Sequence, residues 1–387
     1  MNKEELNRYL VSFDDLKKIS DNKDAEKMMI KYAGVMSNTM DHIKQEENVE
    51  NLSQWITKIN NMLGAAVSAP AIGPDLTTLL SDVMKNNGGL EVVMDSLNTN
   101  HSELKLNSAK ILNNVLTTDT KNYVVEKGLD KAVAVTKSYT KANKDIKKNP
   151  EHCRLATDIL DKLFDHSEET VGKVIEMGGL MTVVEECKSK DPETLRHCAS
   201  ALANVAIYGG SENQEEMIKK NVPNWLFPLL FNEDVTIRYY ALLSIAVLGA
   251  NKEIEAEIQK TDSFKQVMPI LAKMNPSDFS EFLAIGKSKA WLLRLLPVLS
   301  SEREESKNLA AFHFCMEAEK KVKEGKEGIF EEIGAIDALK KVASCPNGIA
   351  SKYAAQALRH LKQDVPHKLS QQVPTWRIDD VKVEMSK

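Results

Sequence analysis

The sequence predicts an all-α superhelical solenoid, and two observations lead to this fold class. Residues 195–258 contain three helical segments in a row, and the last of them, 237–248, is apolar on nearly every face. Such a helix must be covered on several sides, so one group of helices cannot bury it alone and needs similar groups stacked before and after it. Similar phrases do recur along the chain, and no β-alternating run competes with them.

Within the unit at 195–258, helical spacing places the apolar residues of the first helix on one stripe: Leu195, Ala199, Leu202 and Val205. Gly209-Gly210 is expected to end this helix. A second helix is expected from Pro223 to Phe231, with a kink at Pro228, and a polar turn separates it from the apolar helix at 237–248.

Before the repeats, three polar-rich helices are expected near 3–19, 24–45 and 49–66, which together form an N-terminal helical cap over 1–72. The solenoid of about six repeats then spans 73–364. The remaining residues, 365–387, form a proline-containing, charged tail that we expect to be poorly packed.

Each repeat is expected to open with a short turn and an apolar helix, followed by a longer helix rich in Ala and Leu. Glycines mark most of these openings: Gly88-Gly89, Gly128, Gly178-Gly179 and Gly334. A helix at 264–271 opens the fifth repeat, and an added helix at 308–323 lengthens the last interval. The earlier openings lie roughly 40 to 50 residues apart, which is typical of armadillo or HEAT repeats.

Composition excludes several classes of protein. The 387 residues have a net charge of −5 and a pI near 6.0, without a dense basic stripe of the kind that nucleic acid requires. The sequence lacks an apolar run long enough to cross a bilayer, and its start lacks the apolar core of a signal peptide. We therefore expect a cytoplasmic protein. Its five scattered cysteines are expected to be reduced and mostly packed in the core.

Short motifs do not indicate catalysis. Gly286-Lys287-Ser288 resembles the end of a phosphate-binding loop, but Glu281 stands where that loop requires glycine. The pairs His152-Cys153 and His197-Cys198, together with His313 and Cys315, are interpreted as core cysteines beside partly exposed histidines, since adjacent helical residues point about 100° apart. Adjacent glutamates at 168–169 and 304–305 suit helix starts. The lysine-rich segment 137–148 is interpreted as a solvated face rather than a partner site.

Several phrases closely resemble the armadillo region of the SARM family, the sterile-alpha and TIR-motif NAD hydrolases. They are LRHCASALANVAIYGG at 195–210, ENQEEMIKKNVPNWLFPLLF at 212–231, YYALLSIAVLGANKEIEAEI at 239–258 and HSEET at 166–170. The resemblance covers about 76–376. It implies an armadillo solenoid that, in the family, is followed by two ring-building sterile-alpha-motif (SAM) domains and by a TIR domain that cleaves NAD.

The resemblance implies a regulatory role for this chain, which we expect not to be an enzyme by itself. The family's solenoid holds TIR domains apart and senses NAD against nicotinamide mononucleotide, in proteins of axon degeneration and innate-immune signalling. The expected partners are therefore the TIR and SAM domains of longer copies, with NAD or nicotinamide mononucleotide as an allosteric ligand and no required cofactor or metal. The alternative is an armadillo scaffold for proteins of a MAP-kinase pathway.

The family's nucleotide pocket can be transferred position by position. A base-stacking Trp aligns with Val67 and a phosphate-binding Arg with Pro74, so neither group is present. A second Arg aligns with Lys121, which could meet a phosphate as a point charge, and a family Lys aligns with Asp165, which would repel one. The candidate pocket residues are Lys121, Asn114 and Leu116.

Armadillo relatives of the importin and catenin type bind extended peptides on a ladder of Trp and Asn. Three asparagines lie on the corresponding helices here, Asn113, Asn114 and Asn204, but no Trp precedes them by a turn. We do not expect that mode of peptide binding. For Trp55, Trp225 and Trp291, core packing is the expectation.

Overall fold

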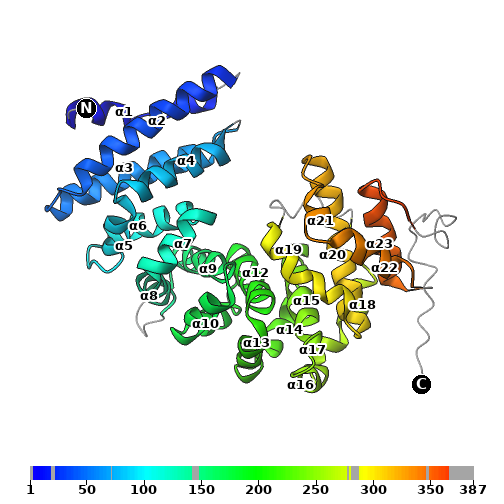
Figure 1. Ribbon diagram of the computed structural model, residues 1–387. Helices are drawn as coiled ribbons and strands as arrows, with labels where there is room; N and C mark the ends of the chain where they lie inside the picture. The colour runs from blue at the N-terminus through cyan, green and yellow to red at the C-terminus, as the bar shows by residue number, and fades with distance from the viewer. Residues whose placement is uncertain are drawn as a thin grey trace. The chain divides into compact units, whose positions relative to one another are not determined.

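Every regular element of the described residues is a helix, which confirms the predicted all-α solenoid (Figure 1). The computed structural model describes residues 3–18, 22–70, 72–141, 148–276, 279, 287–345 and 348–365. Contacts divide the chain into two compact units. Unit 1 comprises Met1–His166 with Gly172–Glu186, and unit 2 comprises Ser167–Val171 with Cys187–Lys387. The expected division into a cap, a solenoid and a tail at 72 and 364 stays a prediction.

The N-terminal region begins with two short helices where the sequence predicted one. They are α1 (Lys3–Tyr9) and the 3-10 helix η1 (Asp14–Lys18). Between them, the Ser12 hydroxyl accepts the Asp14 backbone N–H at 3.4 Å and donates to the Asp14 carboxylate at 2.9 Å. Such local bonds compete with the helical ladder, and the predicted helix over 3–19 is wrong in this respect. The next two helices, α2 (Asn22–Ile43) and α3 (Val49–Val67), lie close to their predicted positions.

Each of the next repeats has three helices rather than the two that the sequence indicated, and this trio distinguishes an armadillo repeat from a HEAT repeat. The first trio is α4 (Gly73–Asn86), α5 (Gly89–Ser96) and α6 (Ser102–Val115); the second is α7 (Thr118–Lys127), α8 (Leu129–Thr140) and α9 (Pro150–Phe164); the third is α10 (Glu168–Glu176), α11 (Gly179–Glu186) and α12 (Pro192–Tyr208); the fourth is α13 (Gly210–Lys219), α14 (Val222–Leu229) and α15 (Val235–Gly249).

The remaining repeats are less regular. Their helices are α16 (Glu255–Gln259), α17 (Asp262–Lys265), α18 (Val267–Leu271), α19 (Lys289–Leu295), η3 (Leu296–Ser300), α20 (Glu304–Lys323), α21 (Ile329–Glu332), α22 (Ala335–Ala343) and α23 (Ile349–His360). The single helix predicted over 264–271 is wrong, because the chain forms α17 and α18 with Gln266 between them. Pro269 in α18 has no N–H to donate, so a continuous ladder cannot pass through it.

Within each unit, successive long helices pack against one another. In unit 1 the series is α3, α6 and α9, and in unit 2 it is α12, α15, α20 and α23. As expected from its apolar sequence, α15 is buried on all sides, including every residue from Tyr239 to Gly249. Polar side chains in this core bond to main-chain carbonyls, as when the Ser306 hydroxyl of α20 donates to Ala246 O of α15 at 2.6 Å. Each long helix therefore completes the core of its neighbours.

Left-handed residues shape several of the turns that open a repeat's second helix. Gly88 precedes α5 with φ 75°, a conformation that costs glycine little. The corresponding turn before α14 uses Asn221 with φ 59°, which is one of the non-glycine residues that visit this region most easily. A search for glycines alone therefore misses this opening.

Most of the burial predictions are confirmed. Four cysteines are buried and carry free thiols, whereas the thiol of Cys345 is exposed. Trp55 and Trp291 lie in the core, but Trp225 is only half-buried, with the Lys188 ammonium 4.5 Å from its ring centroid. At the ends of the lysine-rich segment, Lys137 donates to Met177 O at 3.0 Å and Lys148 pairs with Glu186. Residues 142–147 and the tail from 366 lie outside the described residues.

Replacement of Asp234 by Ala tests how α15 is started. The Asp234 carboxylate accepts the N–H groups of Thr236 at 2.8 Å and Ile237 at 3.3 Å, and it also pairs with Arg196. Burial opposes its ionisation, but hydrogen bonds from Arg196 and from the two N–H groups outweigh burial and hold its pKa below the ordinary 3.8. We expect the variant to lose about 1–2 kcal/mol of protection in α15 at pH 7.

Hydrogen exchange of the α15 amides measures this loss at the level of one helix, which avoids assuming that the two units unfold together. Because the folded-state pKa is depressed, the contribution is fully present above about pH 4 and is lost as the pH falls further. Glu233→Ala, at the neighbouring position, is the control. An equal loss in both variants would contradict the capping role of Asp234.

Candidate functional site

The predicted site residue Lys121 lies in α7 and is buried, with 8% of its surface exposed. Its ammonium donates to Asp165 O at 2.7 Å and lies 3.3 Å from the Asp165 carboxylate. Asp165 is the C-cap residue of α9, so the lysine charge lies beside the negative end of a helix as well as beside a carboxylate. The structure thus brings together two residues, 44 positions apart, that the sequence analysis had treated separately.

Asn114 and Leu116 lie on the same corner of unit 1 as Lys121. Asn114 is half-buried in the last turn of α6, and Leu116 is its buried C-cap residue, directly before α7. That these two residues line one pocket wall with Lys121 stays a prediction. The neighbouring wall is already bonded across helices, because Asn113 donates to Asp158 at 2.6 Å and accepts from Lys162 at 2.9 Å.

Val67 and Pro74 lie at the α3–α4 corner, where the family would supply an aromatic plane and a charge. Val67 ends α3 and is 51% exposed, and Pro74 occupies the exposed first turn of α4. Gly73 lets the two helices approach closely, since a Cβ there would lie 3.0 Å from Val67 O. This corner offers a small apolar surface and no cation.

Near Lys121, burial and the lysine charge keep the imidazole of His166 neutral. His166, next to Asp165, bonds to the Asn122 side chain at 2.7 Å. Burial, and secondarily the Lys121 charge, lower the pKa of this imidazole, while Asp165 opposes them. An anionic ligand at this corner would find one cation that is already paired, so it must displace the Asp165 carboxylate.

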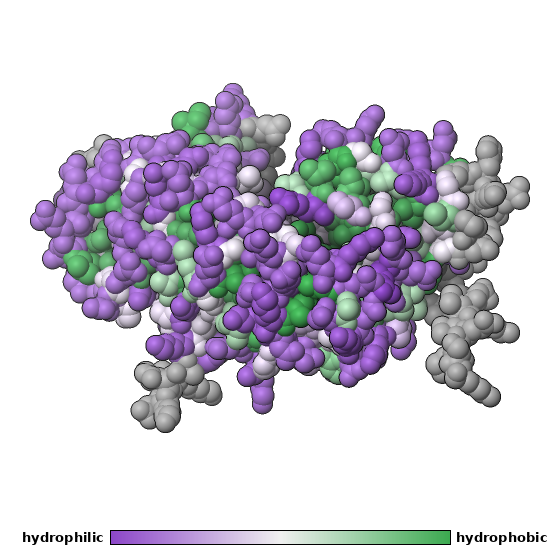
Figure 2. Space-filling view, turned by 60° about the horizontal axis from the view of Figure 1, so that its bottom comes forward, coloured by the Kyte–Doolittle hydropathy of each residue, from purple (hydrophilic) through white to green (hydrophobic). Residues whose placement is uncertain are grey.

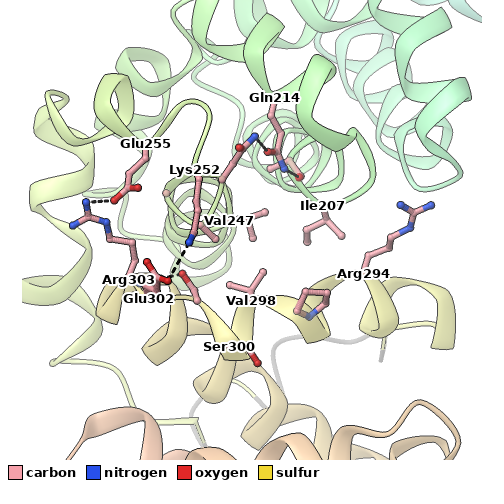
Figure 3. Close-up of a pocket in the computed structure, with 16 residues that line it drawn as sticks. Ile207, Gln214, Val247, Lys252, Glu255, Arg294, Val298, Ser300, Glu302 and Arg303 are labelled. Atoms are coloured by element: carbon pink, nitrogen blue, oxygen red, sulfur yellow. Dashed lines mark hydrogen bonds and ion pairs between the residues drawn. The ribbon is translucent and has the colours of Figure 1, made fainter.

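Unit 2 contains a cavity of about 360 Å³ (Figure 3). Ile207, Val247 and Val298 give it an apolar lining. Its charged lining residues are paired: Lys252 with Glu302 at 3.0 Å, Arg303 with Glu255, and Arg294 with Glu168, which lies outside the lining. The amides of Asn251 and Gln214 bond to each other at 2.7 Å. The cavity is therefore large enough for a small ligand, but its charges are engaged within the fold.

An aromatic pair is exposed on α14 and the turn after it. Phe227 and Phe231 are 37% and 56% exposed, and their rings pack edge to face with centroids 5.3 Å apart. Polar residues cover most of the surface shown in Figure 2, where hydrophobic side chains gather only in smaller groups. Large exposed aromatic side chains that cluster on one helix are typical of protein contact sites. The phrase WLFPLLF contained this signal, but the sequence alone indicated a core helix.

Other motifs have structural roles. His313 is fully buried, so the interpretation of a partly exposed histidine beside Cys315 is wrong there, because α20 packs against both α15 and α23. Asn204 is buried and accepts the Trp291 indole N–H at 3.0 Å, although the two lie far apart in sequence. Ser288, from the phosphate-loop-like motif, caps α19 by accepting the Trp291 backbone N–H at 3.2 Å. Gly286 lies outside the described residues.

Two further searches cover the described part of the chain. No group of three or more His, Cys, Asp or Glu side chains there could hold a metal ion. None of the helices described is both long and apolar enough to cross a membrane.

Comparison with solved structures gives distant likenesses to armadillo designs. A designed armadillo repeat protein in complex with the peptide (KR)4 is 18% identical, with a TM-score of 0.42, and the match covers 70% of this chain and 99% of that one. An engineered protein is 17% identical, with a TM-score of 0.47, over 94% of this chain and 100% of that one. No family model matches the chain.

Curated relatives match almost the whole chain. NAD(+) hydrolase sarm1 of Drosophila melanogaster is 47% identical over 98% of this chain and 29% of its own length. NAD(+) hydrolase SARM1 of Danio rerio is 33% identical over 89% and 48%, and NAD(+) hydrolase tir-1 of Caenorhabditis elegans is 31% identical over 92% and 37%. The chain thus spans less than half the length of each of these relatives. Together with the helical trios, these matches show that the chain belongs to the SARM family and corresponds to its armadillo region rather than to its TIR domain.

Proposed function

We propose that this chain is the regulatory armadillo region of a SARM-type NAD hydrolase and that it restrains NAD cleavage by contact with a TIR domain. Three relatives that match almost all of the chain are NAD(+) hydrolases by name, and each is more than twice as long as the part matched. An armadillo region inside such an enzyme can act on the catalytic domain only through contacts, either direct or through the SAM domains.

The exposed aromatic pair on α14 is the observation that carries this proposal. Phe227 and Phe231 present a rigid apolar surface beside the half-buried Trp225. The backbone beneath them is held firmly, because Leu226 and Leu229 of the same helix are in the core of unit 2. A rigid aromatic surface loses little conformational entropy on binding, which suits a contact that must form reversibly.

The TIR domain is the partner that fits this surface best. In a longer protein the domain is tethered to the armadillo region, so its effective concentration at the surface reaches the millimolar range. A contact that is weak between separate molecules is then sufficient to hold the catalytic domain inactive. Loss of the contact would release it without any change in the armadillo fold.

The double substitution Phe227→Ser and Phe231→Ser tests the contact. The purified chain is titrated against the separately purified TIR domain of the Drosophila relative, and both binding and NAD cleavage are measured. We expect the wild-type chain to lower cleavage, and the double variant to bind at least about tenfold more weakly, because two central aromatic anchors typically contribute more than 1 kcal/mol each.

Leu293→Ser is the matched control, since Leu293 is 51% exposed in the same unit. It should behave as the wild type. Equal inhibition by the wild-type chain and the double variant would contradict the α14 surface. No effect of the wild-type chain on cleavage, together with recovery of MAP-kinase pathway proteins that depends on Phe227 and Phe231, would favour the scaffold instead.

A second proposal concerns NAD or nicotinamide mononucleotide as an allosteric ligand at the Lys121 corner. One observation supports it, which is that Lys121 is buried and that its ammonium lies against Asp165. The phosphate would take the place of the Asp165 carboxylate, which now lies 3.3 Å from that ammonium. Sensing in this chain is then a competition between an internal carboxylate and a phosphate.

Isothermal titration with each nucleotide tests this competition. Asp165→Asn keeps the size and the carbonyl contact but removes the competing charge, so we expect it to raise the affinity about tenfold, as removal of one nearby like charge should. Lys121→Ala should abolish binding, and Lys127→Ala, in the exposed part of the same helix, should not. Ligand at about 100 times its dissociation constant should also stabilise unit 1 by about 2.7 kcal/mol. Absence of binding to Asp165→Asn would exclude the site.

A further inference from the structure

A buried cluster of polar side chains joins four helices of unit 2. His313 and Glu317 come from α20, Tyr239 from α15 and Asn204 from α12, and Trp291 comes from α19. Each of them is almost completely inaccessible to solvent. Neither the proposed contact on α14 nor the Lys121 corner uses this cluster. Buried titratable groups are costly unless they are bonded, so the pairing within the cluster requires an explanation.

The imidazole of His313 is bonded on only one side. Its Nδ1 is hydrogen-bonded to the Tyr239 hydroxyl. Its Nε2 is buried without a hydrogen-bond partner among the described residues and lies 3.8 Å from Glu317 Oε1, which is beyond hydrogen-bonding distance. The Trp291 ring covers the imidazole, with centroids 4.6 Å apart. Water therefore cannot reach the unbonded nitrogen while α19 is in place.

Glu317 is turned toward the start of α19 instead. Its two carboxylate oxygens accept the Lys287 backbone N–H at 3.1 and 3.3 Å. The Lys287 ammonium lies 4.8 Å from the Tyr240 ring centroid and 5.0 Å from that of Trp291. Trp291 in turn donates its indole N–H to Asn204. The first turn of α19 is thus attached to α12, α15 and α20 through this cluster.

The charged groups around His313 and Glu317 include residues before α19 and on α20, where Lys320 also acts on Glu317. Lys287 precedes α19, and its charge lies near the imidazole; on α20, Lys321 Nζ lies 4.0 Å from Glu317. The tyrosine from α15 and the asparagine from α12 are uncharged. Burial, and then Lys287, lower the pKa of His313 well below its ordinary 6.5, and burial raises that of Glu317 above 4.5. The imidazole is therefore neutral while the cluster is closed.

We propose that His313 and Glu317 form an acid-operated latch that holds α19 at neutral pH and releases its first turn under mildly acidic conditions. An imidazolium at position 313 needs an acceptor for its Nε2–H. It obtains one either when Glu317 turns away from Lys287 or when α19 lifts and admits water. The first rearrangement takes at least one carboxylate oxygen away from the Lys287 N–H and so weakens the attachment of α19, and the second breaks that attachment.

Protonation of His313 and of Glu317 decides whether acid favours the open or the closed form of α19. When α19 lifts, His313 regains a pKa near its ordinary 6.5, whereas the closed cluster resists a proton there. Below about pH 6.5 the open form therefore binds more protons, and its population rises up to tenfold for each further pH unit. Burial raises the pKa of Glu317 in the closed form, and protonation of this carboxyl there opposes the opening. The latch therefore operates below about pH 6.5 and above the pH at which Glu317 is protonated in the closed form.

Hydrogen exchange of the amides at 289–299 tests the latch in the full chain, with rates corrected for the intrinsic effect of pH. Between pH 7.5 and 5.5 we expect the wild-type protection of these amides to fall about tenfold. His313→Gln retains a hydrogen-bonding side chain without a titrating ring, and it should show no such fall. Glu317→Leu removes the acceptor of the Lys287 N–H and should expose the start of α19 already at pH 7.5. The α6 amides of unit 1 are the internal control.

Unchanged protection of α19 in the wild type, or an equal fall in the His313→Gln variant, would overturn the proposal. If either variant fails to fold, as judged by the protection of α15 and α20, the wild type still decides the question. The imidazole signal of His313 is then followed by NMR over the same pH range. Titration of His313 that coincides with exchange of α19 supports the latch, and exchange of α19 without this titration overturns it.

Discussion

The structure depends on the burial of long apolar helices by one another. Helix α15 has no polar face along most of its length, so it cannot be exposed to water on any side. It is stable as a helix because α12, α14 and α20 cover it. The same requirement applies along the series from α12 to α23. Each member contributes one face to the core of the preceding helix and another to the next. Stability in such a series is a sum over neighbours, and every functional feature is attached to a helix that two neighbours hold.

This constraint explains which parts of the fold were predictable. The long helices have enough turns for an apolar pattern to become distinct, and they were found close to their true positions. The shorter first helices α7 and α13 were not predicted. Each has 10 residues of mostly polar sequence, which give a weak periodic signal, and a helix this short is only marginally stable without its neighbours. The breaks at Ser12 and Gln266 depend on local hydrogen bonding and on Pro269, which outweigh the apolar pattern over a few residues.

The residues of the candidate site could be predicted from the sequence, but their contacts with one another could not. Alignment with the family identified Lys121 and Asp165, and it indicated that a carboxylate here would oppose a phosphate. The direct pairing of the two could not be obtained from spacing, because it depends on how the end of α9 lies beside α7. His313 was misjudged for a related reason. Its neighbours in sequence suit a helix with one exposed face, whereas α20 is covered on two sides by other long helices.

The two buried charged features share a physical principle. Lys121 is paired with Asp165, and the start of α19 is bonded to Glu317. In each case an internal carboxylate already binds the group that an incoming ligand or proton would have to free. In the two proposals, a phosphate would compete for the first and a proton would act on the second. Because an internal partner is always present at high effective concentration, such sites respond only when the competing species is abundant. In a series of stacked helices the response also stays local, and a lifted α19 would alter its contacts with α12 and η3 first and would reach α23 only through α20 or α22. A solenoid of this kind could therefore carry several independent inputs without unfolding the core that positions the exposed aromatic pair Phe227 and Phe231.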